Sequence, residues 1–415
     1  MTTDPGFAPR TGRSNARQAA TDVIAAGEAS SGLAARIRNT LPWILLLGYA
    51  GFSCGYFLFG DYSDHYRFYS RGLFFLSLFV IATPLRQLLS DSLFRLILAY
   101  MSYFLISALW SSPFDVFRLG QKFVLCALII SFLAVTHYLY QWRTEAFLHM
   151  LRLCIGIAAV AGLTSIAVFY QSHEFPSMRL EGLGSLTNIN EFSNVYAVFA
   201  LLAAGFATNA KSFIQRVPYL VAIGVFLSVA WFGQSRTSFV ALSACLIAYA
   251  ALTLPGRRML IMVYMLAFVV ALVLAFPGSL QEAVTRGAGL RPAIWLGMWD
   301  HAQDSILFGN GLITELHVIV ADFRMETAHN AYLQAVLHGG LLGLALLVAL
   351  LCYGLMRAWQ LGQSSGNYVV LCILMYCSLA MLTGVDTLIE RPRDQWMLFW
   401  FPFALLLSQP RANTL

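Results

Sequence analysis

Apolar residues are gathered in long runs along this chain, and this feature constrains the fold most strongly. A helix needs about 20 apolar residues to cross roughly 30 Å of hydrocarbon. Runs of that length recur between residues 41 and 409. The residues are 59% hydrophobic and 11% charged, whereas soluble domains are about 25% charged. We therefore expect an all-α fold, a polytopic transmembrane helical bundle.

We expect about 12 transmembrane spans, because polar or basic residues bound each long apolar run. The net charge of +6 does not indicate a nucleic-acid partner, since the basic residues are scattered at the ends of the runs. An even number of spans puts both termini on one side, and the positive-inside rule makes that side the cytoplasm. The expected spans lie near 41–59, 70–85, 94–110, 119–138, 148–170, 191–208, 216–233, 237–254, 258–276, 338–358, 367–385 and 395–409.

Residues 1–38 differ in composition from the rest of the chain. They are rich in Ala, Ser, Gly, Thr and Arg, with almost no large apolar side chains. They are not a secretory signal, because no short apolar stretch with a small-residue cleavage site follows. We expect a disordered cytoplasmic tail at 1–38 and a transmembrane domain at 39–410. The cysteines lie mostly inside apolar runs and indicate neither disulfides nor a zinc site.

Three loops expected on the outer side have unusual polar content. They comprise residues 171–190, 234–236 and 277–337. The parity of the spans places all three on one face of the membrane. The longest, 277–337, should contain helices of its own, because structureless connections of that length are uncommon.

Two helices are expected within 277–337. A first helix should begin at Pro292 and end at the turn 309–311, and its apolar residues predict an amphipathic helix at the membrane interface. A second should begin at Thr327, whose hydroxyl can cap it, and continue into the next span. The residues that recur at helical spacing in the first helix are Ile294, Trp295, Met298 and Trp299.

His329 is the first candidate for chemistry. In the first turn of the second helix, the positive end of the macrodipole would keep its imidazole neutral and able to accept a proton. The alternative is an interfacial histidine that only forms hydrogen bonds. His338 lies nine residues on, on the opposite face of a continuous helix, so the two histidines are not expected to share a metal.

Arg236 and Arg291 are candidates for binding phosphate. A guanidinium binds phosphate oxygens bidentately, and Arg236 lies at a membrane edge where a phosphate tied to a lipid tail would lie. If both arginines converge on one pocket, they could hold a diphosphate without a metal. The alternatives are an arginine that reaches lipid headgroups and a surface charge of the interfacial helix.

Two acidic clusters are alternative candidates for a metal site, and we interpret both as solvated faces. No nucleotide-binding, serine-hydrolase or zinc-protease motif occurs in the sequence, and no cofactor is expected. The charged residues of 386–394 are interpreted as mutual surface pairs, though they could contact a substrate. The clusters are Asp61, Asp64 and His65, and Asp300, His301 and Asp304.

The order of several motifs resembles the O-antigen ligase and O-antigen polymerase superfamily. Each motif is short, but their order and their placement in the loops are together fairly specific. The resemblance covers roughly residues 40–409. The motifs are Arg179–Asn194, Ser235–Ser238, Arg291–Trp295, Phe308–Gly311, His329–Gln334 and Gly339–Gly343.

The resemblance implies a glycosyltransferase of the Gram-negative inner membrane with a periplasmic active site. A ligase transfers O-antigen from undecaprenyl diphosphate to a sugar hydroxyl of lipid A–core, which completes lipopolysaccharide. By the motifs, Arg236 and Arg291 would bind the donor diphosphate, and His329 would activate the acceptor hydroxyl. No metal or other cofactor is implied. Further residues of the motifs and their surroundings are expected to bind substrate: Arg179, Asn190, Asn194, Trp295 and Tyr332.

Three other functions remain open from the sequence. An O-antigen polymerase would use the same donor with a second lipid-linked glycan as acceptor, and a protein-glycosylating ligase is a further possibility. The moderate length and the single dominant outer loop favour the lipopolysaccharide ligase. A polysaccharide-lipid transporter or flippase is a different class, and it is disfavoured because the middles of the spans are nearly free of charge.

Overall fold

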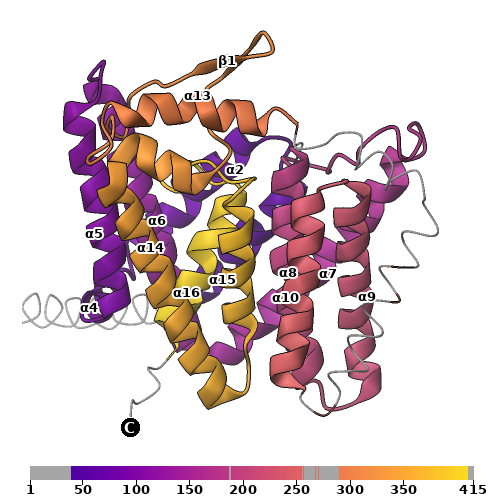
Figure 1. Ribbon diagram of the computed structural model, residues 1–415. Helices are drawn as coiled ribbons and strands as arrows, with labels where there is room; N and C mark the ends of the chain where they lie inside the picture. Colours follow the sequence, from indigo (N-terminus) through magenta and orange to yellow (C-terminus); the bar gives the residue numbers. More distant parts are fainter. Residues whose placement is uncertain are drawn as a thin grey trace, which may run out of the picture.

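The computed structural model describes residues 39–409 with two gaps. Thr187 is not described, and only three residues of 255–288 are described. The expected tail at 1–38 and the expected span at 258–276 lie outside the described residues. The described chain is a transmembrane helical bundle, and Figure 1 shows its long helices running side by side. We call the end that carries helix α13 (Arg291–Gln303) and the hairpin of β1 (Val318–Val320) with β2 (Phe323–Met325) the loop end. The expected fold class is confirmed.

In the described part of the chain, eight helices are long and apolar enough to cross a membrane. Two shorter apolar helical segments follow them, α15 (Val369–Ala380) and the run of η4 (Trp396–Trp400) with α16 (Phe401–Ser408). The total of twelve spans stays a prediction. The eight helices are Asn39–Leu58, α5 with η2 (Ser92–Trp110), α6 (Val116–Trp142), α7 (Thr144–Phe169), α8 (Ile189–Asn209), α9 (Phe213–Phe232), α10 (Arg236–Thr253) and α14 (Ala331–Ser365).

The expected span at 70–85 does not form one helix. A helical run at Tyr62–Ser77 is followed by α4 (Ala82–Leu89), and the two are bent by 88°. Pro84 gives a physical reason, because it has no N–H to donate and is tolerated only in the first turn of a helix. The first run consists of α2 (Tyr62–Phe68), η1 (Tyr69–Leu73) and α3 (Phe74–Ser77).

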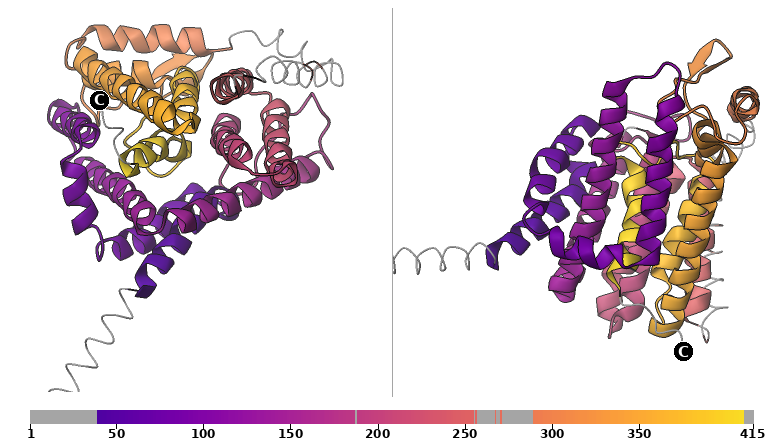
Figure 2. Two further views of the ribbon diagram at one scale, coloured as in Figure 1. Left: turned by 90° about the horizontal axis from the view of Figure 1, so that it is seen from below. Right: turned by 90° about the vertical axis from the view of Figure 1, so that its left-hand side faces the viewer.

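Helix α8 occupies the centre of one half of the bundle. Of its apolar 18-residue stretch, 83% is buried inside the protein, whereas the corresponding share is 33% for α7 and for α9. It packs against α7, α9, α10 and α15. Figure 2 shows α8, α9 and α10 beside the group of α14, α15 and α16. Residues in the first turn of α8 therefore lie at the loop end between both groups.

Helix α14 is broken near its start, at Gly340 (φ 63°, ψ −164°). The backbone groups released by the break are paired with the segment that follows α13. The N–H of Leu341 donates to the carbonyl of Ile306 (2.8 Å), and the N–H of Asn310 donates to that of Leu337 (2.8 Å). Because an unpaired backbone group at membrane depth costs several kcal/mol, the segment and the break depend on each other.

Helix α13 (Arg291–Gln303) lies across the loop end in Figure 1. It has Pro292 in its first turn, as expected, and its side chains Ile294 and Met298 are buried in a cluster with residues of α14. The helix ends at Gln303, and a turn rather than more helix leads to Gly309, so the expected end was too late. The chain then forms a hairpin that the sequence did not predict, β1 (Val318–Val320) with β2 (Phe323–Met325).

The break in α14 predicts a large effect of Gly340→Ala. A Cβ there would lie 2.3 Å from the carbonyl carbon of Leu307. Gly366 is a matched control, because its φ of +71° is also left-handed but nothing lies within 4 Å of its Cβ position. In thermal unfolding of the detergent-solubilised protein, Gly366→Ala should cost about 1–2 kcal/mol and Gly340→Ala clearly more. Equal losses would contradict the docking of the segment on the break.

Candidate active site

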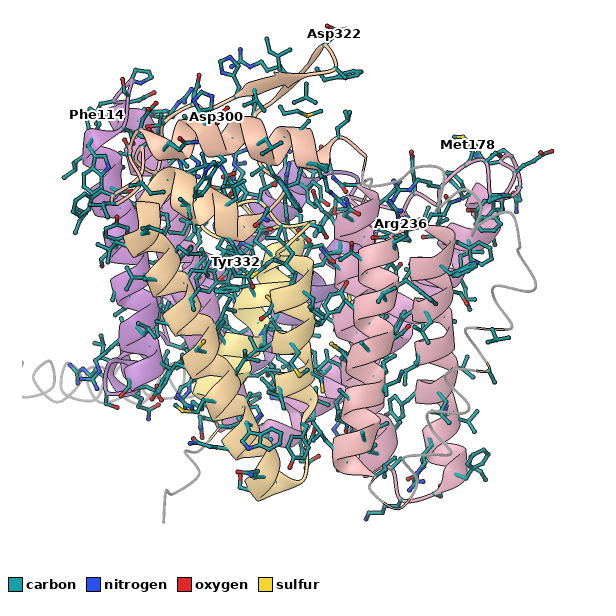
Figure 3. The ribbon with its side chains drawn as sticks, in the orientation of Figure 1. Phe114, Met178, Arg236, Asp300, Asp322 and Tyr332 are labelled. Atoms are coloured by element: carbon teal, nitrogen blue, oxygen red, sulfur yellow. The ribbon has the colours of Figure 1, made fainter. Side chains whose placement is uncertain are left out.

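The three predicted catalytic residues each stand at the start of a helix at the loop end. Arg236 begins α10, Arg291 begins α13, and His329 precedes α14. Figure 3 shows Arg236, Asp300 and Met178 at this same end of the bundle, with Tyr332 just below. In the described part of the chain, residues of all three polar loops thus lie at one end of the bundle (Figure 3).

His329 is not in the first turn of a helix, so that expectation was wrong. The N-cap of α14 is Asn330, whose Oδ1 accepts from the N–H groups of Tyr332 (3.0 Å) and Leu333 (3.1 Å). Asn330 therefore takes the capping role expected of Thr327. His329 lies one residue before the cap, with a left-handed φ of +48°. The argument that the helix macrodipole keeps its imidazole neutral does not apply.

His329 is paired with a carboxylate instead. Its Nδ1 lies 3.2 Å from Oδ1 of Asp386, and the two side chains are 44% and 29% exposed. The neighbouring Asp386 carboxylate raises the pKa of His329, whereas burial and the Arg291 charge lower it, and the net effect is a raised pKa. The charge of Glu191 also raises this pKa. His329 is consequently a stronger base than a free histidine.

Arg291 and Arg236 act on each other electrostatically. Burial lowers the pKa of the Arg291 guanidinium, and the positive charge of Arg236 lowers it further. The two arginines are thus close enough for their charges to repel, although they come from separate segments. An anion between two such groups would relieve the repulsion and accept hydrogen bonds from both.

The interpretation of 386–394 as mutual surface pairs was wrong. Asp386 pairs with His329, and Glu390 pairs with Lys122 of α6 (Oε2 to Nζ, 2.9 Å). Arg393 lies 3.7 Å from the carboxylate of Glu191. The segment therefore connects the site to α6 and α8. Its density of charges was the signal in the sequence, but the partners are remote and could not be assigned.

A buried polar layer lies beneath these groups. Asn194 donates from Nδ2 to Oδ2 of Asp394 (2.7 Å), and its Oδ1 accepts from the hydroxyl of Tyr376 (2.9 Å). Burial raises the pKa of Asp394 well above its usual range, and the charge of Glu191 adds to this. Asn194 is 1% exposed. Its polar atoms thus hold the scaffold together, and a substrate would reach it only after a rearrangement.

The other predicted substrate-binding residues join the segments of the site. Arg179 donates from Nε to the carbonyl of Gly233 (3.1 Å), which ties the loop after α7 to the head of α10. Asn190 accepts at Oδ1 from the hydroxyl of Ser235 (3.2 Å). The two remaining residues donate to backbone carbonyls, Trp295 to Ala328 (2.9 Å) and Tyr332 to Ser378 (2.9 Å). Apart from the buried Asn194, these side chains are partly exposed.

The acidic cluster after the first span has structural roles. Asp61 caps α2 by accepting from the N–H of Asp64 (2.8 Å), and Asp64 pairs with Arg67 (2.6 Å). His65 is buried, and its Nε2 lies 2.8 Å from the carbonyl oxygen of Phe52. Its interpretation as part of a solvated face was therefore wrong, because the one-turn spacing does not fix which side of a short helix is covered.

The second acidic cluster lies on the exposed side of α13. Asp300 accepts from the amide of Gln303 (3.4 Å), and Nε2 of His301 lies 3.1 Å from the carbonyl of His317. Within the described residues, no group of three or more His, Cys, Asp or Glu is arranged to hold a metal ion.

Fold and site together define a polytopic α-helical membrane protein with arginine and histidine side chains gathered at one end of the bundle. A family model described as O-antigen ligase matches residues 220–348, which include Arg236, Arg291 and His329. The chain is also 29% identical over 380 residues to an O-antigen ligase of Pseudomonas aeruginosa, covering 88% of this chain and 90% of that protein. The resemblance to the O-antigen ligases is thereby confirmed along most of the chain.

The His329–Asp386 pair predicts a measurable change in titration. In NMR of the histidine-labelled protein in detergent micelles, His329 should titrate above the ordinary pKa of about 6.5, and Asp386→Asn should lower its pKa. Because the folded pKa is raised, the stabilisation from the pair is present below the ordinary pKa and lost as pH rises through the raised value. His329→Gln identifies the resonance. An unchanged pKa in Asp386→Asn would contradict the pairing.

Proposed function

We propose that this protein is an O-antigen ligase of a Gram-negative inner membrane. It transfers O-antigen polysaccharide from undecaprenyl diphosphate to a sugar hydroxyl of lipid A–core at the periplasmic face. The observation that carries the proposal is the meeting of Arg236, Arg291 and the His329–Asp386 pair at one end of the bundle. The similarity to an O-antigen ligase over most of the chain supports it.

The arginines stabilise the leaving group. When the bond between the anomeric carbon and the donor phosphate oxygen breaks, negative charge accumulates on the undecaprenyl diphosphate. Arg236 and Arg291 bind that diphosphate, and as its negative charge grows its attraction to both arginines increasingly offsets their mutual repulsion. Arg236 and Arg291 stand at the starts of two separate helices, which fix their backbone positions before the substrate binds.

His329 acts as the general base. Its Nδ1 faces Asp386, so the tautomer with a proton on Nδ1 leaves the lone pair of Nε2 for the acceptor hydroxyl. As the hydroxyl oxygen attacks the anomeric carbon, its proton passes to Nε2, and Asp386 stabilises the imidazolium that forms. The attack is direct, without an enzyme nucleophile or a metal, and it inverts the configuration at the donor carbon.

The topology of the proposal follows the positive-inside rule, with both termini in the cytoplasm and the loop end in the periplasm. Residues 39–410 form the glycosyltransferase domain, and 277–337 form its periplasmic loop. The spans hold the site at the membrane surface, where the two lipid-linked substrates meet among the membrane lipids. A transporter is disfavoured because the groups that carry the proposal lie at one end of the bundle.

His329→Ala tests the proposal. Purified protein should convert lipid-linked O-antigen and lipid A–core to higher-mass lipopolysaccharide in the presence of EDTA. His329→Ala should reduce the rate by about 10²–10⁴-fold, the usual contribution of a general base. In the native protein the rate should rise with pH through the raised pKa of His329, because the neutral imidazole is the reactive form.

His301→Ala is the matched control, since His301 is a partly exposed histidine of the same end whose ring contacts a backbone carbonyl. It should keep full activity. Full activity of His329→Ala would make the assignment of the base wrong. A requirement for a divalent ion would contradict the arginine-only account, and product formed without lipid A–core would identify a polymerase.

A further inference from the structure

Two arginines of the segment 386–394 are stacked on two tyrosines of α2. The guanidinium carbon of Arg391 lies 5.2 Å from the ring centroid of Tyr66, and that of Arg393 lies 5.2 Å from that of Tyr62. Tyr62 and Tyr66 are one helical turn apart and therefore share a face of α2. We call these four residues the arginine–tyrosine platform.

The platform has an excess of positive charge. Arg391 forms no ion pair with any carboxylate in the described chain, and its neighbour Glu390 is already paired with Lys122. Arg393 is partly compensated. Its side chain is 49% exposed and lies 3.7 Å from Glu191, which also accepts a hydrogen bond from Tyr62, and its charge acts on Glu390 and Asp394 as well. A guanidinium that lies over a ring keeps N–H groups that can donate to an oxyanion.

The platform is connected to the proposed base through Glu191. Glu191 contacts Arg393, and its charge also acts on His329, so Glu191 lies between them. Arg291 acts on His329 as well, and Arg236 acts on Arg291. His329 is therefore linked to Arg291 directly and to the platform through Glu191. If Arg236 and Arg291 hold the donor diphosphate, the acceptor must be held by other groups within reach of His329.

We propose that the arginine–tyrosine platform is a subsite for a phosphate group on the sugars of the lipid-linked acceptor. A phosphate ester carries a charge of about −1.5 to −2 at neutral pH, which matches two guanidinium groups of which one is partly compensated. Two N–H edges held by stacking bind such an oxyanion with little loss of side-chain freedom. The inference rests on the proposed function and names where its acceptor binds.

Arg391→Gln tests the subsite, because Arg391 lacks a carboxylate partner whose charge its loss would leave unpaired. In phosphatidylcholine vesicles, the variant should raise the KM for lipid A–core about tenfold or more, the loss expected for one charged hydrogen bond. The KM for the donor and kcat should change by less than about twofold, since the chemistry is unaltered. Lipid A–core treated with phosphatase should show a similarly raised KM with the native protein.

The decisive comparison is Arg391→Gln with the phosphatase-treated acceptor. If the arginine and the phosphate contact each other, Arg391→Gln has little further effect on the KM for the phosphatase-treated acceptor. If Arg391→Gln raises the KM equally for the untreated and the phosphatase-treated acceptor, the proposal is overturned. An effect that appears only when anionic phosphatidylglycerol is added would also overturn it, by assigning the platform to lipid headgroups.

Arg67→Gln is the matched control. Arg67 is an exposed arginine of α2, the helix that carries Tyr62 and Tyr66, and its charge is compensated by Asp64. It should leave the acceptor KM unchanged, and equal effects of the two variants would indicate a general loss of surface charge and overturn the subsite. If the native protein transfers no glycan at all, the proposed function fails first, whereas a native KM in Arg391→Gln rejects the subsite alone.

Discussion

The pairing between the broken start of α14 and the segment after α13 determines how the loop end is built. Without the segment 305–311, the carbonyls and N–H groups released at Gly340 would be unpaired at membrane depth. The pairing fixes the C-terminal side of α13, and Trp295 fixes the helix again at Ala328. The start of α14 is held in turn by a bond from the N–H of Ala331 to the carbonyl of Met381. Backbone pairing thus sets the positions of Arg291 and His329 before any charge is considered.

Electrostatics then divides the loop end into regions of different sign. Arg236 and Arg291 repel each other and favour an anion, while Asp386 and Glu191 favour protonation of His329. This arrangement suits a reaction in which one substrate leaves as an anion and the other loses a proton. The same separation explains why acids and bases are concentrated in loops that would otherwise need only to connect spans.

Much of this arrangement could be predicted from the sequence, because it depends on local patterns. Apolar runs locate most spans, Pro292 locates the start of α13, and parity brings three loops to one face. The predictions that failed depend on competition between neighbouring residues for one role, or on contacts between residues far apart in the sequence. Asn330 rather than Thr327 caps α14, which changes the physical reason why His329 could act as a base. The pairs of Asp386 and Glu390 join segments far apart in the chain, and no spacing rule identifies such partners.

The proposed mechanism depends on Arg236 and Arg291 holding one diphosphate together. Binding of undecaprenyl diphosphate to the native protein, Arg236→Gln, Arg291→Gln and the double variant measures this directly, as a double-mutant cycle. The account predicts strongly non-additive losses, in which the second substitution weakens binding much less than the first. Losses that simply add, or a loss confined to one arginine, would contradict a shared diphosphate site.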